Sequence, residues 1–87
     1  MLSAMPEKLV KVQIVYLDGI ETKEQWEQRH VQTRQNLLDH GAILVSDILA
    51  TDTELLTDTK QCYVMQFKGV SVKSAADLLD GPGSVEG

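Results

Sequence analysis

Residues 22–41 read TKEQWEQRHVQTRQNLLDHG, and this stretch decides the fold because it carries both end signals of one long helix. Thr22 and Gln25 have the spacing of a capping box, in which the side chain of each residue satisfies the backbone N–H of the other. Gly41 is the glycine expected just after a helix, where the backbone turns left-handed. The sequence therefore predicts a helix that begins after Thr22 and ends at about His40.

A strand is predicted on each side of this helix. Upstream, apolar residues recur with the period of two that is typical of a strand with one buried face, and they are Val10, Val12, Ile14 and Tyr16. The turn signal Asp18-Gly19 ends this strand. Downstream, the run from Ala42 to Ala50 is short and rich in branched apolar residues, which indicates a second strand.

A third strand is predicted over Gln61 to Phe67, after a polar and acidic loop from Thr51 to Lys60. Alternation places Cys62 and Val64 on one face of this strand, and Tyr63, Met65 and Phe67 on the other. The single cysteine lies in an apolar run, so we interpret it as a core thiol rather than a nucleophile. A lone cysteine also excludes an internal disulfide framework.

A second, shorter helix follows, with Ser71 as its cap and Val72 to about Leu79 as its body. Gly81-Pro82-Gly83 ends it. The order is β-α-β-β-α with an antiparallel sheet, which is an α+β, ferredoxin-like domain without its last strand. We expect the five residues after Pro82 to be too few for that strand. Either the strand is missing after Gly87, or a partner covers the exposed edge, which favours a homodimer.

The composition describes an ordinary small globular protein. The chain has 87 residues, 43% hydrophobic and 24% charged, so we expect one domain over residues 1–87, with 1–8 flexible. A core of this size gains from oligomerisation. The net charge of −5 argues against a nucleic-acid partner, because phosphate recognition needs clustered basic residues. No apolar run approaches the roughly 18 residues of a membrane span, so we expect no membrane partner and a cytoplasmic location.

His30 is the most informative residue of the long helix. On a helical wheel it falls within the apolar arc near Trp26 and Leu37, and Thr33 lies beside it. An imidazole that faces a sheet must find a hydrogen-bond partner or line a cavity. It is therefore either a core histidine bonded to a backbone carbonyl or a cleft histidine suited to proton transfer near neutral pH.

Acids near the sheet are the candidate partners of this histidine. Asp47 interrupts an otherwise apolar strand, where an unpaired carboxylate is costly to bury. It either points to solvent or caps a strand end, or it pairs with His30 and orients the ring. Tyr16, Asp18 and Asp80 are weaker candidates. No HExxH, CxxC, phosphate-binding glycine loop or GxSxG is present, so we expect neither a metal nor a cofactor.

One stretch resembles a known family. Trp26-Glu27-Gln28-Arg29-His30, followed by Leu37-Leu38, Gly41 and Ile43-Leu44, is similar to the YCII-related family, as is the helix of Ser71 to Leu79. Family members have Gly-Pro after the second strand, where this chain has Asp47-Ile48, and an Asp-Pro turn that appears here as Asp80-Gly81-Pro82.

The resemblance implies a ferredoxin-like protomer that dimerises through its sheet into a dimeric α/β barrel, with a His-Asp pair in a cleft. It also implies one activity, the dehydrochlorination of a chlorinated hydroxyquinol in chlorinated phenoxyacetate breakdown. That reaction needs no cofactor, because a base removes a proton and chloride leaves as the quinone forms.

Two functions remain open at this point. The first is a cofactor-independent lyase or isomerase on a small aromatic substrate. In this function His30 is the general base and Asp47 or Asp80 orients it, while the substrate-binding candidates are Trp26, Tyr16, Thr33 and Ser46. The second is a non-catalytic, dimeric ligand-binding or accessory protein of the same family, in which His30 is packed and bonded to backbone. A dimeric-barrel monooxygenase ranks below both.

Overall fold

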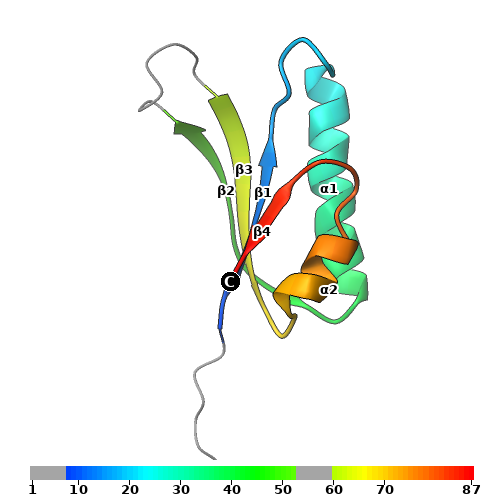
Figure 1. Ribbon diagram of the computed structural model, residues 1–87, viewed down its shortest axis with the longest axis vertical. Helices are drawn as coiled ribbons and strands as arrows, with labels where there is room; N and C mark the ends of the chain where they lie inside the picture. Colours follow the sequence, from blue (N-terminus) through cyan, green and yellow to red (C-terminus); the bar gives the residue numbers. More distant parts are fainter. Residues whose placement is uncertain (1–7, 53–59) are drawn as a thin grey trace, which may run out of the picture.

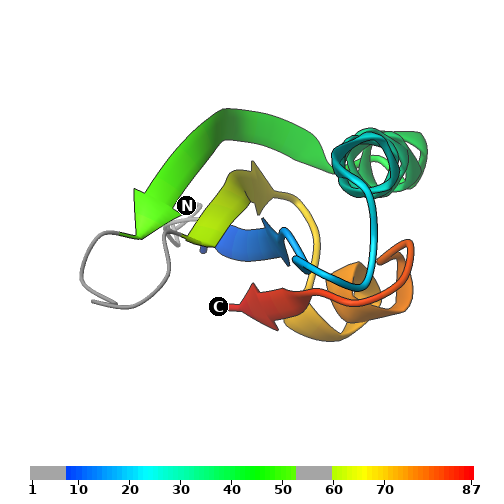
Figure 2. The ribbon, with the colours of Figure 1, turned by 90° about the horizontal axis from the view of Figure 1, so that it is seen from above.

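The computed structural model describes residues 8–52 and 60–87, which form a four-stranded antiparallel sheet and two helices (Figure 1). The sheet has the strand order β2-β3-β1-β4, and both helices lie on the same side of it (Figure 2). Along the chain the elements are β1 (Val10–Val15), α1 (Lys23–Asp39), β2 (Ile43–Asp52), β3 (Lys60–Lys68), α2 (Val72–Asp77) and β4 (Ser84–Glu86).

The end signals of α1 act as the sequence predicts. The backbone N–H of Gln25 donates to Thr22 Oγ1 at 3.1 Å, and the N–H of Thr22 donates to Gln25 Oε1 at 2.9 Å, which completes the capping box. Gly41 has a φ of +96°, and its N–H donates to the Leu38 carbonyl at 3.0 Å. The positive φ requires glycine or a strained substitute, so the helix ends here for a local reason.

The core lies between the sheet and the two helices. The alternating residues of β1 are buried, and so are Met65 and Phe67 of β3, as predicted from their spacing. Trp26 and Leu37 of α1 and Ala75 of α2 cover them. Cys62 differs from the prediction of a core thiol, because it is only half-buried and pairs with Val15 in the β1–β3 ladder.

A fourth strand is present, so the expectation that the residues after Pro82 supply none was wrong. β4 pairs antiparallel with β1, with Val85 opposite Val12. Three residues suffice because β1 already presents a free row of backbone donors and acceptors, and Val85 packs against the core. The loop before β4 is held in place by Arg29, whose guanidinium donates to the Pro82 carbonyl.

The boundaries of the other elements shift by a few residues. β2 runs on to Asp52 and β3 starts at Lys60, which shortens the predicted Thr51–Lys60 loop, while α2 ends at Asp77 instead of Leu79. The rest of that loop, and the predicted flexible stretch 1–8 apart from Lys8, lie outside the described residues. Neither helix in the described ranges combines the length and apolar character needed to cross a membrane.

An irregularity in β2 decides the direction of its side chains. The register places Leu44 opposite Phe67 and Ser46 opposite Gln66, so Val45 is an extra, bulged residue. Because side chains alternate along a strand, one inserted residue reverses the faces of all that follow. Asp47 is consequently opposite Met65, on the helix-covered face, whereas an unbroken ladder from Leu44 would turn it to the other face.

Candidate functional site

His30 and Asp47 form a direct pair between α1 and β2. His30 is 7% exposed and lies on the buried side of α1. Its Nε2 is 2.9 Å from Asp47 Oδ1 and 3.0 Å from Oδ2, so it donates to both carboxylate oxygens. Of the acids considered from the sequence, Asp47 is the one that the structure brings to the histidine. The imidazole is therefore bonded to a carboxylate, not to a backbone carbonyl.

Arg34 is a second donor to the same carboxylate. It follows His30 by one helical turn, and its Nη1 donates to Asp47 Oδ2. The Asp47 side chain is 15% exposed, and that of Arg34 is 32% exposed, so the guanidinium lies toward the rim of the site. Two donors with positive or partly positive charge compensate an acid that would otherwise be costly on a buried face.

Tyr63 covers one face of the imidazole. The two ring centroids are 3.7 Å apart and the ring planes differ by 3°, which is a parallel stack. Tyr63 also contacts Trp26, with a centroid distance of 4.5 Å. Trp26 in turn contacts Tyr16, with a centroid distance of 5.3 Å. The imidazole is thus the end of a row of four aromatic rings.

The Tyr63 phenol resists ionisation. Burial raises its pKa above the ordinary value, and the negative charges of Glu27 and Asp47 raise it further. Tyr63 therefore presents a neutral ring to His30 throughout the neutral pH range. A phenolate at this position would instead compete with Asp47 for the imidazole charge.

The geometry of the pair specifies one tautomer. Because the Nε2–H is donated to Asp47, the neutral ring carries its free lone pair on Nδ1. Nδ1 is thus the basic nitrogen of the ring, the one that can take up a proton. When it does so, the adjacent carboxylate stabilises the imidazolium that forms. This is the arrangement of a general base with an orienting acid.

A second ionic cluster ties two loops to α1. Arg29 donates to Glu21 through Nε at 2.8 Å and through Nη2 at 2.7 Å, and Nη2 also donates to the Val15 carbonyl at 2.8 Å. The bond from Arg29 lowers the pKa of Glu21 below its ordinary value, against the opposing effect of burial. Together with the contact to Pro82, this guanidinium fixes the segments before α1 and before β4.

The other residues singled out from the sequence have packing or surface roles in the structure. Trp26 is 3% exposed, and its indole N–H donates to the Ile14 carbonyl at 2.8 Å. Thr33 is fully buried and accepts the backbone N–H of Asp80 at 2.9 Å. Ser46 donates to Gln66 at 3.2 Å, on the face of the sheet away from Asp47. Tyr16 is half-buried against Trp26, and Asp18 is exposed in the turn after β1.

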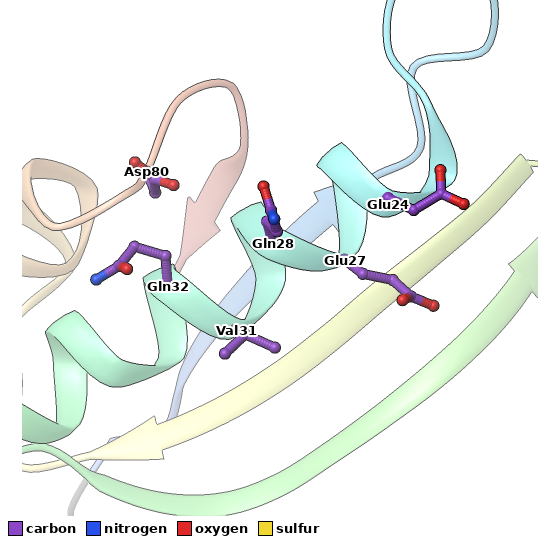
Figure 3. A pocket seen from close by; sticks show the side chains of 6 residues that line it. All are labelled: Glu24, Glu27, Gln28, Val31, Gln32 and Asp80. Atoms are coloured by element: carbon purple, nitrogen blue, oxygen red, sulfur yellow. The ribbon is translucent and has the colours of Figure 1, made fainter.

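The side chain of Asp80 belongs to a different surface feature. It is exposed and borders a shallow hollow of about 580 Å³ along α1 (Figure 3), whose lining residues are Glu24, Glu27, Gln28, Val31, Gln32 and Asp80. His30 is not among them. Of the two acids that the sequence left as alternatives, the structure thus brings Asp47 to the histidine.

Sequence reasoning did not identify Arg34 or Tyr63 as members of the site. Arg34 had a usable signal, since a residue four positions after His30 shares its side of the helix. The signal for Tyr63 was weaker. Alternation predicted which face of its strand it occupies, but not which part of α1 it contacts.

No protein-family model, curated protein or solved structure matches the chain.

Proposed function

We propose that this protein is a small cofactor-independent enzyme in which His30 acts as a general base and Asp47 orients it. The observation that carries the proposal is the hydrogen bond from Nε2 to both oxygens of Asp47, at 2.9 and 3.0 Å. It fixes the tautomer, leaves Nδ1 as the acceptor and supplies a counter-charge for the imidazolium. These are the properties that a base needs to work near neutral pH.

The substrate class that we propose is a chlorinated hydroxyquinol or a similar small aromatic. In this reaction one hydroxyl proton moves to the ring carbon that carries chlorine, and Nδ1 of His30 takes the proton of a second hydroxyl. The C–Cl bond then breaks, chloride leaves to solvent, and the ring becomes a quinone. The imidazolium then returns its proton to water. The net change is loss of HCl, so neither an oxidant nor a reductant is required. The resemblance of the segment around Trp26–His30 to YCII-related proteins supports this choice.

Turnover of a chlorinated hydroxyquinol tests the proposal directly. His30→Ala should lower kcat by about 10²-fold or more, the usual scale for loss of a general base. His40→Ala is the matched control, because His40 is an exposed residue at the end of α1, and its rate should equal that of the wild type. A folded His30→Ala variant with unchanged turnover, on a substrate that the wild type converts, contradicts the proposal.

We further propose a ferredoxin-like protomer that forms a homodimer through its sheet. The support is the exposure of apolar residues on β2, an edge strand, namely Ile43 (53%), Val45 (48%), Ile48 (56%) and Leu49 (51%). Edge strands with exposed apolar side chains are prone to pair with another chain. Sedimentation equilibrium should give a dimer for the wild type and a monomer for Ile48→Lys. A monomeric wild type at micromolar concentration contradicts this part. The cytoplasmic location stays a prediction.

A non-catalytic ligand-binding or accessory protein is the second candidate. The observation in its favour is the cover over His30, which is 7% exposed beneath Tyr63. A proton NMR titration of both histidines, with and without chlorinated hydroxyquinols, separates the two functions. A His30 signal that titrates and shifts with ligand supports the enzyme. A signal that ignores both pH and ligand supports the packed, non-catalytic histidine.

A further inference from the structure

The imidazole of His30 is restrained in two independent directions. Asp47 holds one edge of the ring through Nε2, which limits its displacement but still permits rotation about the hydrogen bond. Tyr63 lies parallel to the ring face, with 3.7 Å between centroids and 3° between planes, which opposes that rotation. The carboxylate alone therefore does not define the plane of the ring, and Tyr63 does.

We infer that Tyr63 is a positioning residue of the proposed active site, and that it fixes the direction from which His30 accepts a proton. The inference rests on the proposed function of His30. The lone pair of Nδ1 lies in the plane of the imidazole. A ring held parallel to Tyr63 accepts a proton only from a group that approaches at its edge, in that plane. A hydroxyl on a planar aromatic ring meets this requirement.

Tyr63 is rigid enough for such a role. Its backbone lies within β3, opposite Ile14 on one side and Leu49 on the other. Its ring also meets Trp26 at 4.5 Å, and the Trp26 indole is bonded to the Ile14 carbonyl at 2.8 Å. Two aromatic contacts, His30 with Tyr63 and Tyr63 with Trp26, thus connect the ring of His30 to the backbone of β1.

The same stack contributes to the charge balance after proton transfer. The face of a neutral aromatic ring attracts a cation placed within about 6 Å of its centroid. Once Nδ1 is protonated, the imidazolium faces Tyr63 and has Asp47 at its edge. Removing the Tyr63 ring therefore withdraws both the orientation of the base and part of the stabilisation of its product. Both effects lower kcat more than they change KM.

Two variants separate these roles from simple packing. Tyr63→Phe keeps the aromatic ring and therefore the stack on His30. Tyr63→Leu keeps a smaller apolar side chain but removes the ring. We expect kcat within about 2-fold of wild type for Tyr63→Phe and about 10- to 10²-fold lower for Tyr63→Leu, the scale of a misplaced catalytic group. KM for the chlorinated hydroxyquinol should stay nearly constant. A kcat for Tyr63→Leu equal to that of Tyr63→Phe overturns the inference.

A spectroscopic measurement judges the inference without any turnover. In the wild type, the ring protons of His30 should lie upfield of those of the exposed His40, because they lie over an aromatic face, and should show nuclear Overhauser effects to Tyr63. The upfield shift should persist in Tyr63→Phe and vanish in Tyr63→Leu. If the wild type shows neither signature, Tyr63 does not position His30. If the signatures are present but no hydroxyquinol is converted, the proposed function is wrong, although Tyr63 still holds the His30 ring.

Discussion

Asp47 lies directly opposite Met65 in the β2–β3 ladder, although Met65 is fully buried. An acid thus occupies a position on the helix-covered face, where an apolar residue is the usual choice. The structure compensates it with two donors from successive turns of α1, His30 and Arg34. The bulge at Val45 creates the position, and α1 supplies the partners, so the pair depends on two elements that meet only in the folded chain.

The carboxylate should therefore matter for stability as well as for chemistry. Asp47→Asn keeps the shape but removes the charge that both donors face, and we expect the free energy of unfolding to fall by about 1–3 kcal/mol. Urea unfolding at pH 7 measures it. Asp39→Asn is the control, because Asp39 is exposed at the end of α1, and its effect should stay within about 0.5 kcal/mol. Equal effects of the two substitutions would show that Asp47 is not specially bonded.

Stability should decrease in acid in part through Glu21. Its folded pKa is lowered by Arg29 from an ordinary value of 4.5, so the ionised form stabilises the fold above that pH, and the contribution is lost as the pH falls through the folded pKa. Thermal melts between pH 7 and 3 should show a smaller acid-induced drop in Tm for Glu21→Gln than for the wild type. Glu24→Gln, an exposed neighbour, should retain the wild-type drop. Parallel curves for all three proteins would refute this assignment.

The hydrogen bond from the buried Trp26 indole, which attaches α1 to β1, should contribute measurably to the free energy of unfolding. Trp26→Phe keeps an aromatic ring but removes the N–H that the Ile14 carbonyl accepts. Because this carbonyl also lies in the β1–β3 ladder opposite Tyr63, the variant loses one hydrogen bond rather than stranding an acceptor, and the expected cost is about 0.5–1.5 kcal/mol. Chemical denaturation should show the loss as a lower midpoint with an unchanged slope. An unchanged midpoint would mean that the Ile14 carbonyl does not depend on this bond.

Cys62 should react slowly with thiol reagents. Burial raises the pKa of its thiol above the ordinary value of 9.0, so less thiolate is present at pH 8 than for a free cysteine. Labelling with iodoacetamide should be slower than for glutathione at pH 8, and should reach the model-thiol rate in denaturing urea. Labelling of the folded protein as fast as glutathione would place the thiol in a more open environment than the structure shows.

The local features of the fold were predictable from the sequence. The capping box of Thr22 and Gln25, the positive φ of Gly41 and the alternation along β1 each depend on residues within a few positions of one another. Interactions between residues this close in sequence can be recognised from the local sequence pattern. The burial of His30 followed from the same local rule, because one face of a helix must meet the sheet.

The strand β4 and the Cys62 environment were not predicted correctly. Three residues have no recognisable strand pattern by themselves, and β4 exists because β1 offers it a ladder and Arg29 holds the loop that leads to it. Alternation gave the face of Cys62 correctly, but the helices cover only the other face of the sheet. Both errors came from judging a segment without the elements beside it.

The sequence by itself determined the helices, the first three strands and a histidine on the buried face of α1, because these depend on local spacing. Only the tertiary structure decided that Asp47, and not Asp80, meets His30, and that Tyr63 stacks on the ring. The physical reason is the extra residue at Val45. A single bulge reverses the side-chain faces of β2 beyond it, and its position depends on pairing with β3 rather than on any pattern within β2.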